Sequence, residues 1–306
     1  MQILRKQNTH GIVTDSDWQR LFGTVPYHWL KAREARIGAP FTDEQFQTFL
    51  LSPASLEMQR EWDETLTEMK RADMRALGTG VLLWLPAGAS IHARVFPLIK
   101  PRHNSFVWTK PDDGPAIFLY LERQTRAKFE NTVAHECHHI GLQSLEKEQD
   151  AVRAKMSPAT KTAVHWMSAF GEGEAMLAAV GSTERHPHWE DDAVARARWD
   201  GDLMHFNTDL GALQQFFLDI VDGRLQGDDA IQERAAPFWG DVQGAWYTVG
   251  YEMAVLVEKR YGRQAFTECL IDPRRLLVLY NQIALEANQQ GASLATWSPA
   301  LLEKLK

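Results

Sequence analysis

The chain has 306 residues, 44% of them hydrophobic and 24% charged, which is typical of a folded globular protein of one or two lobes. Its formal net charge of -7 provides no general basic surface for nucleic acid, and its apolar runs are too short to cross a bilayer. Its two cysteines, Cys137 and Cys269, can form neither a disulfide framework nor a four-cysteine zinc site. We therefore expect a cytoplasmic protein that binds neither nucleic acid nor membrane.

The first 80 residues are predicted to be helical. Residues 15–17 (Asp-Ser-Asp) and 42–44 (Thr-Asp-Glu) are typical of helix starts, because their side chains can accept hydrogen bonds from free backbone N–H groups. Residues 54–77 are charged, nearly free of helix breakers, and carry apolar residues at helical spacing. This stretch is predicted to be a helix with a solvated face.

The pattern changes near residue 78. Residues 81–85, 91–99 and 115–122 are short apolar runs separated by Pro, Gly and Asn, which predicts three strands of a small mixed or antiparallel sheet. The run 115–122 could offer an edge that pairs with an extended peptide.

The rest of the chain is predicted to be helical, in segments at roughly 125–146, 158–180, 188–222, 241–262 and 272–290. The expected fold class is therefore α+β and predominantly helical, with a small sheet followed by a helical lobe. Residues 1–306 are expected to form one unit, with sub-lobes at 1–124 and 125–306.

Residues 131–139 (Asn-Thr-Val-Ala-His-Glu-Cys-His-His) contain His-Glu-x-x-His within a predicted helix. Residues four apart lie one turn apart on the same helix face, so His135 and His139 can direct two imidazoles at one metal ion. Zinc is commonly bound at this spacing, about 2.0–2.1 Å from each nitrogen. Glu136 lies about 100° round the helix from His135, so it can accept a proton from a water at the metal.

The alternative for this segment is a histidine-rich face held by hydrogen bonds, with no metal. Three histidines and a glutamate within five residues are costly to bury without a purpose, which favours the metal site. His138 is expected to point away from the other two histidines, in a supporting or surface position. Cys137 is expected to be a small buried residue that faces away from the metal.

A catalytic zinc ion needs a third protein ligand and one open position for water. The metzincin pattern would place Gly and His three and six residues after the second histidine, but Leu142 and Leu145 stand there. The third ligand must therefore come from another part of the chain.

Residues 170–176 (Phe-Gly-Glu-Gly-Glu-Ala-Met) resemble the Gly-Glu-Gly-x-Ala signature of the gluzincin metallopeptidases. The resemblance implies that Glu172 is the third zinc ligand and that Ala175 lets two helices approach, with Glu174 as the reserve ligand. The interval after the second histidine is longer than in thermolysin-like enzymes, which predicts an extra loop or helix around residues 143–158. A glutamate that only stabilises a helix start is the alternative.

Residues 246–254, with the pattern Tyr-x-x-Gly-x-x-Met-Ala, and residues 258–262 (Glu-Lys-Arg-Tyr-Gly) provide a second resemblance. They are similar to the C-terminal part of a bacterial family of zinc-dependent peptidases with a His-Glu-x-His-His core and no assigned substrate. The resemblance extends over most of the chain.

Zinc peptidases usually place a Tyr or His donor where the oxyanion forms. Tyr247 is the preferred candidate, Tyr251 lies one turn later, and Gly250 between them would permit close packing against the metal-binding helices. His205 is a further candidate. Buried core residues without a catalytic role are the alternative for all three side chains.

The resemblance implies a thermolysin-like catalytic core and a zinc peptidase with one Zn²⁺ per chain, held by His135, His139 and Glu172. Glu136 would be the general base, Tyr247 would stabilise the oxyanion, and a peptide or protein substrate would extend along residues 116–122. The alternatives are a non-hydrolytic zinc-binding protein that retains the fold and a zinc amidohydrolase acting on a non-peptide amide.

Overall fold

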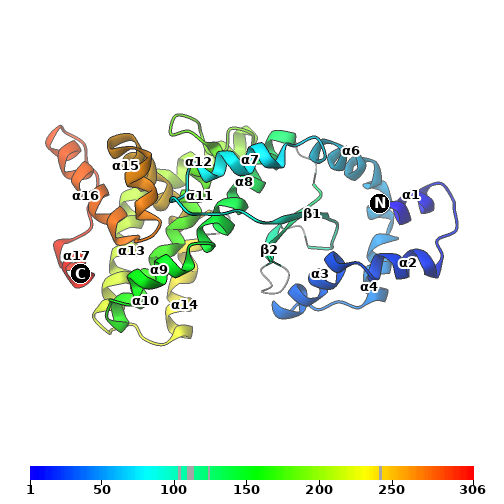
Figure 1. Cartoon of the computed structure of the whole chain (residues 1–306), viewed down its shortest axis with the longest axis horizontal. Coiled ribbons are helices and arrows are strands. Elements are labelled where there is room, and N and C mark those ends of the chain that lie inside the picture. Colours follow the sequence, from blue (N-terminus) through cyan, green and yellow to red (C-terminus); the bar gives the residue numbers. More distant parts are fainter. Residues whose placement is uncertain (103–104, 109–113, 123–124, 241–242) are drawn as a thin grey trace. The chain divides into compact units, whose positions relative to one another are not determined.

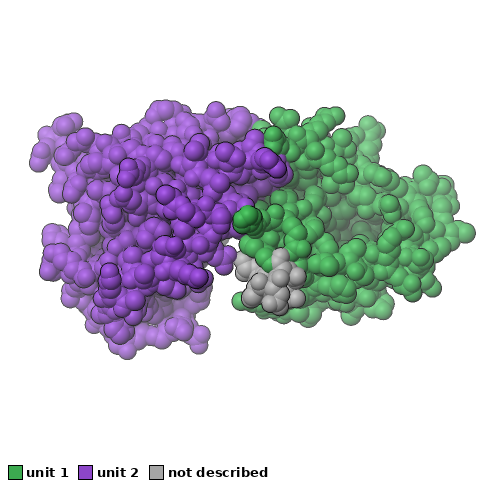
Figure 2. Space-filling model, in the orientation of Figure 1, with its two compact units in different colours: residues 1–73, 92–130 green, residues 74–91, 131–306 purple. Residues whose placement is uncertain are grey.

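The computed structural model describes residues 1–102, 105–108, 114–122, 125–240 and 243–306. The chain divides into two compact units, coloured in Figure 2. Unit 1 comprises residues 1–73 and 92–130, and unit 2 comprises residues 74–91 and 131–306. Whether the chain acts as a single catalytic unit stays a prediction. The predicted sub-lobe boundary at Gln124 and the predicted helix start at 241 lie outside the described residues.

Unit 1 combines short helices with a small sheet (Figure 1). Thr14 and Thr42 begin two of its helices through capping boxes with Asp17 and Gln45. The elements of unit 1 are α1 (Gln2–Asn8), α2 (Asp15–Phe22), α3 (Val25–Arg36), α4 (Asp43–Leu50), α5 (Pro53–Glu57), α6 (Gln59–Met69), β1 (Arg94–Leu98), β2 (Phe106–Trp108) and β3 (Ala116–Tyr120).

The sheet is mixed, with strand order β1-β3-β2. β1 pairs with β3 in parallel and β2 pairs with β3 antiparallel, so that Phe96 and Phe106 both lie opposite Phe118. All residues of β3 are buried, as expected for a central strand. The prediction of a free peptide-binding edge at 115–122 is wrong, because β3 is paired on both sides.

Unit 2 consists of helices joined by turns and loops, with no strand among its described residues (Figure 1). Trp246 is fully buried at its centre, with the rings of Phe170, Phe216 and Phe217 between 5.5 and 6.1 Å away. The elements of unit 2 are α7 (Met74–Leu82), α8 (Arg126–Gln143, whose first residues belong to unit 1), α9 (Glu146–Arg153), α10 (Pro158–Met167), η1 (Ser168–Phe170), α11 (Gly171–Val180), α12 (Ala193–Leu203), α13 (Phe206–Val221), α14 (Asp228–Ala235), η2 (Ala236–Trp239), α15 (Ala245–Cys269), α16 (Arg274–Gln289) and α17 (Pro299–Lys304).

The predicted fold class is confirmed: the protein is α+β, mainly helical, with a three-stranded mixed sheet. The interval between the second histidine and Glu172 contains an additional helix, α9, as predicted. In the part of the chain that the structure describes, no helix is both long and apolar enough to span a membrane.

Four predicted segments differ from the structure. The predicted helix over 158–180 is divided into α10, η1 and α11, and the one over 188–222 into α12 and α13, with residues 188–192 outside any helix. Residues 81–85 are not a strand but the end of α7 and the turn after it, and they are apolar because Val81, Trp84 and Leu85 are buried. The predicted helix over 54–77 is divided among α5, α6 and α7, with no Gly or Pro at the breaks. No strand was predicted at β2, which has only three residues.

Candidate metal centre

The first two donors of the candidate metal centre come from α8. Val133, Ala134 and Ile140 are at most 5% exposed, and they anchor the helix in the core of unit 2. His135 and His139 lie one turn apart on α8, with ring centroids separated by 4.8 Å and ring planes at 78°. Their Nε2 atoms approach to 3.0 Å, so both imidazoles converge on one point, as the spacing predicts.

Glu172, in the first turn of α11, supplies the third donor. Its Oε2 lies 3.2 Å from Nε2 of His135 and 3.4 Å from Nε2 of His139. Two ligands each about 2.05 Å from a tetrahedral zinc ion stand about 3.3 Å apart, so this donor set fits the ion. The three side chains are 15–30% exposed, which leaves them accessible from solvent. Among the described residues, this is the one group of three or more His, Cys, Asp or Glu side chains that could hold a metal ion.

Glu172 and its partner His139 each stabilise the charged form of the other. Burial would raise the pKa of the Glu172 carboxyl, but hydrogen bonding with His135 and His139 outweighs burial and holds that pKa well below its usual range. Burial likewise would lower the pKa of His139, but the hydrogen bond and charge of Glu172, with Glu136 and Glu174, raise it overall. Glu172 is therefore a carboxylate at neutral pH, as a metal ligand must be.

Two glycines bring α15 against α11 at this site. A Cβ atom on Gly173 would lie 2.1 Å from the backbone nitrogen of Tyr251 and 2.3 Å from the carbonyl oxygen of Tyr247. A Cβ atom on Gly250 would lie 2.5 Å from the carbonyl oxygen of Phe170. The two helix backbones therefore touch where only glycine fits, and the predicted packing role of Gly250 is confirmed.

This contact brings Tyr247 to the donor cluster. Burial, together with the nearby carboxylates of Glu172 and Glu136, raises the pKa of the Tyr247 hydroxyl. The same Glu136 carboxylate acts electrostatically on His139. Glu136 and Tyr247 thus both lie close enough to the donors to interact with them electrostatically, and the raised pKa of Tyr247 keeps its hydroxyl protonated.

The comparison with known proteins agrees with this geometry. The family model described as "Putative zinc dependent peptidase (DUF5700)" matches residues 18–289. The chain belongs to this family. The family description names zinc, and the His135–His139–Glu172 cluster could hold a metal ion. No curated protein and no solved structure matches the chain.

The other two candidate oxyanion donors, Tyr251 and His205, lie away from the metal-donor cluster. The hydroxyl of Tyr251 points to the carbonyl oxygen of Arg185, 3.5 Å away, and its ring packs edge-on against Trp199. His205 is exposed at the start of α13, beside Asp209. Tyr247 is therefore the one of the three predicted oxyanion donors that the described structure brings to the cluster.

Three residues next to the donors are buried. Glu174, the reserve ligand, is 4% exposed and outside the donor cluster, and burial raises the pKa of its carboxyl to about 8. Cys137 is buried as predicted, and burial raises the pKa of its thiol to about 11. His138 is fully buried rather than at the surface, and neither ring nitrogen is hydrogen-bonded within the described residues. Helical spacing alone could not reveal this burial, because it comes from packing by the rest of unit 2.

Proposed function

We propose that the protein is a zinc-dependent peptidase in which His135, His139 and Glu172 hold one zinc ion. The proposal is carried by the convergence of two Nε2 atoms and one Oε2 atom within 3.0–3.4 Å, at the spacing of tetrahedral zinc ligands. The membership of a zinc-dependent peptidase family supports it. A bound zinc ion would supply a water acidified towards neutral pH and would polarise a substrate carbonyl.

Glu136 is the proposed general base. It follows His135 directly on α8, and its carboxylate is near enough to His139 and Tyr247 to affect both electrostatically. From this position it accepts a proton from the attacking water and returns it to the nitrogen of the leaving amine. The pattern His-Glu-x-x-His supports this role, because the glutamate lies beside the two donors and not among them.

Tyr247 is the proposed oxyanion donor. Before substrate binds, its hydroxyl is near the Glu172 carboxylate, and its raised pKa keeps the proton on the oxygen. When the substrate carbonyl becomes tetrahedral, this hydroxyl donates a hydrogen bond to the developing negative charge. Because Tyr247 is fixed by the close contact of α11 and α15, it needs little reorganisation during the reaction.

The Glu136→Gln variant tests the proposal. We expect the zinc content to be unchanged and the hydrolysis of a peptide library, followed by mass spectrometry, to fall by about 10²–10⁴-fold. Glu130→Gln is the matched control on the same helix, because Glu130 pairs with Arg126 and is not among the donors. Equal activity of Glu136→Gln and the wild type would rule out the proposed base.

The same measurements separate the two alternatives. A non-hydrolytic zinc-binding protein would contain zinc and cleave nothing in the library, with or without Glu136. A zinc amidohydrolase would leave peptides intact but release amine from non-peptide amides, and Glu136→Gln would abolish that release.

A further inference from the structure

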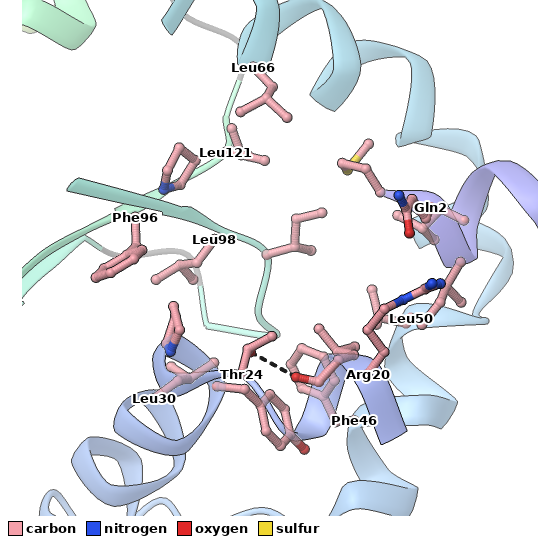
Figure 3. Close-up of a pocket in the computed structure, with 18 of the residues that line it drawn as sticks. Gln2, Arg20, Thr24, Leu30, Phe46, Leu50, Leu66, Phe96, Leu98 and Leu121 are labelled. Carbon is pink, nitrogen blue, oxygen red and sulfur yellow. Dashed lines mark hydrogen bonds between the residues drawn. The ribbon is translucent and has the colours of Figure 1, made fainter. Parts of the chain in front are cut away.

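Unit 1 contains a pocket of about 500 Å³ (Figure 3), and all the residues that line it belong to this unit. Residues from α1, α2, α3, α4, α6, β1 and β3 line it, and most of them are apolar. Its volume is within the range of about 300–1,000 Å³ that is usual for sites of small molecules. The pocket is thus large enough for a ligand and is formed within one compact unit.

The apolar walls face one another across this space. Figure 3 shows Phe96 and Leu98 on one side and Leu50 on the other, with Leu66 at the end near α6. Protein interiors are normally packed without voids much larger than a water molecule. Apolar walls that do not meet therefore leave a surface that an apolar ligand would cover favourably.

Charge is placed at one side of the pocket. Asp17, which is 5% exposed, accepts a hydrogen bond from Lys6 (2.7 Å) and one from Nη2 of Arg20 (2.9 Å). Two cations against one carboxylate leave one net positive charge. Among the described residues, the Arg20 side chain makes only this one hydrogen bond, to Asp17, so its Nε and Nη1 atoms remain available for a ligand. Arg20 itself lines the pocket and is 63% exposed.

Two ion pairs and the N-terminus also lie beside the pocket. Tyr27 lines the pocket and donates to Asp43, which is paired with Lys31 at 2.6 Å. On α1, Arg5 is paired with Asp63 at 2.5 Å. The buried N-terminal amino group of Met1 also lines the pocket and shares Asp63 with Arg5. The excess of basic groups is therefore at Arg20 and at the N-terminus, and it favours an anionic group on the ligand.

We propose that this pocket binds a long-chain carboxylate, a fatty acid, with the acyl chain between the apolar walls and the carboxylate at Arg20. A peptide would be a poor occupant, because each buried N–H and C=O group needs a partner and the lining provides few. An acyl chain has no such groups. A carboxylate also matches the planar guanidinium, which can donate two parallel hydrogen bonds.

Calorimetric titration of the full chain with three probes of equal chain length tests the proposal. The probes are myristate, tetradecan-1-ol and tetradecyltrimethylammonium, each kept below its aggregation limit. We expect saturable binding of one myristate per chain, weaker binding of the alcohol and weakest binding of the cation. No saturable myristate binding, or binding of the cation as tight as that of myristate, would overturn the proposal. Tighter binding of an apolar tripeptide with a free carboxylate would overturn it as well.

Two pairs of variants locate the ligand. Arg20→Gln should weaken myristate about tenfold and leave the alcohol unchanged, whereas Arg5→Gln, which removes the same charge outside the pocket lining, should change neither. Leu66→Trp should fill the pocket and weaken both probes at least tenfold, whereas Leu56→Trp, also half-buried but outside the lining, should not. Unchanged myristate affinity in Arg20→Gln and Leu66→Trp would contradict this placement, and the exposed Arg20 keeps the test valid if Leu66→Trp fails to fold.

Discussion

His139 is the residue at which protons and metal compete most directly. Its pKa is raised above the ordinary 6.5, so the interaction with Glu172 stabilises the metal-free fold below about pH 6.5 and is lost as pH rises through the raised value. The pKa of Glu172 is lowered from 4.5, so its contribution is present above that value and is lost in acid. The ion pair therefore stabilises the metal-free protein most between about pH 4.5 and pH 6.5.

The stabilisation by zinc should consequently increase with pH. Zinc binds neutral imidazoles, so at pH 5 it must displace a proton from His139, whereas at pH 8 this cost is much smaller. We expect the difference in Tm between zinc-loaded and chelator-treated protein to grow steadily from pH 5 to pH 8. A difference that is constant or that shrinks over this range would contradict the assignment of His139 as a ligand.

Tyr247 and Tyr251 provide a matched pair for the oxyanion donor. We expect Tyr247→Phe to lower kcat by about 10²–10³-fold with little change in KM or zinc content, because only the transition state uses the hydroxyl. Tyr251→Phe removes the same group one turn later on α15, where it faces Arg185, and should leave kcat nearly unchanged. Steady-state kinetics of both variants measures the contrast, and equal losses would indicate a general effect of α15.

At the residue scale, the sequence was informative wherever one helix turn determines the geometry. The spacing of His135 and His139 predicts their convergence, and the Gly-Glu-Gly segment led to Glu172, which the structure brings to both. The burial of His138 could not be predicted in this way. It depends on packing partners that lie far along the chain, such as Trp84.

At the scale of elements, the contact of α11 with α15 connects the fold to the site. We expect Gly173→Ala to destabilise the protein by about 1–3 kcal/mol or more and to lower activity, because its Cβ would meet the α15 backbone. Gly211→Ala is the control within α13, where a Cβ meets nothing within 4 Å, and it should stabilise by about 0.5–1 kcal/mol. Urea unfolding measures both, and a neutral Gly173→Ala would contradict the close contact.

The errors at the element scale have one physical cause. A short apolar run indicates burial, but burial alone does not distinguish a strand from a turn packed into a core. Residues 81–85 are the end of α7 and such a turn, with the ring centroid of Trp84 6.2 Å from that of Phe266. The run 115–122 is a strand, but its central position depends on β2, whose three residues carry no pattern of their own.

At the scale of the whole molecule, each unit is assembled from two separated segments. Residues 74–91 belong with 131–306, although 92–130 intervene and belong to the other unit. Local sequence patterns describe continuous segments, so they could predict a mixed first part and a helical second part but not this exchange. The assignment of α7 to unit 2 depends on contacts between distant residues, such as the hydrogen bond from Arg263 to Leu83 just after that helix.

The zinc content of the purified protein, determined by elemental analysis, tests the metal centre most directly. The account predicts one zinc ion per chain in the wild type and a near-complete loss in His139→Ala, with full retention in His205→Ala, which removes an exposed imidazole away from the donors. A wild-type protein without stoichiometric metal after purification and zinc addition, or a His139→Ala variant that retains it fully, would contradict the account.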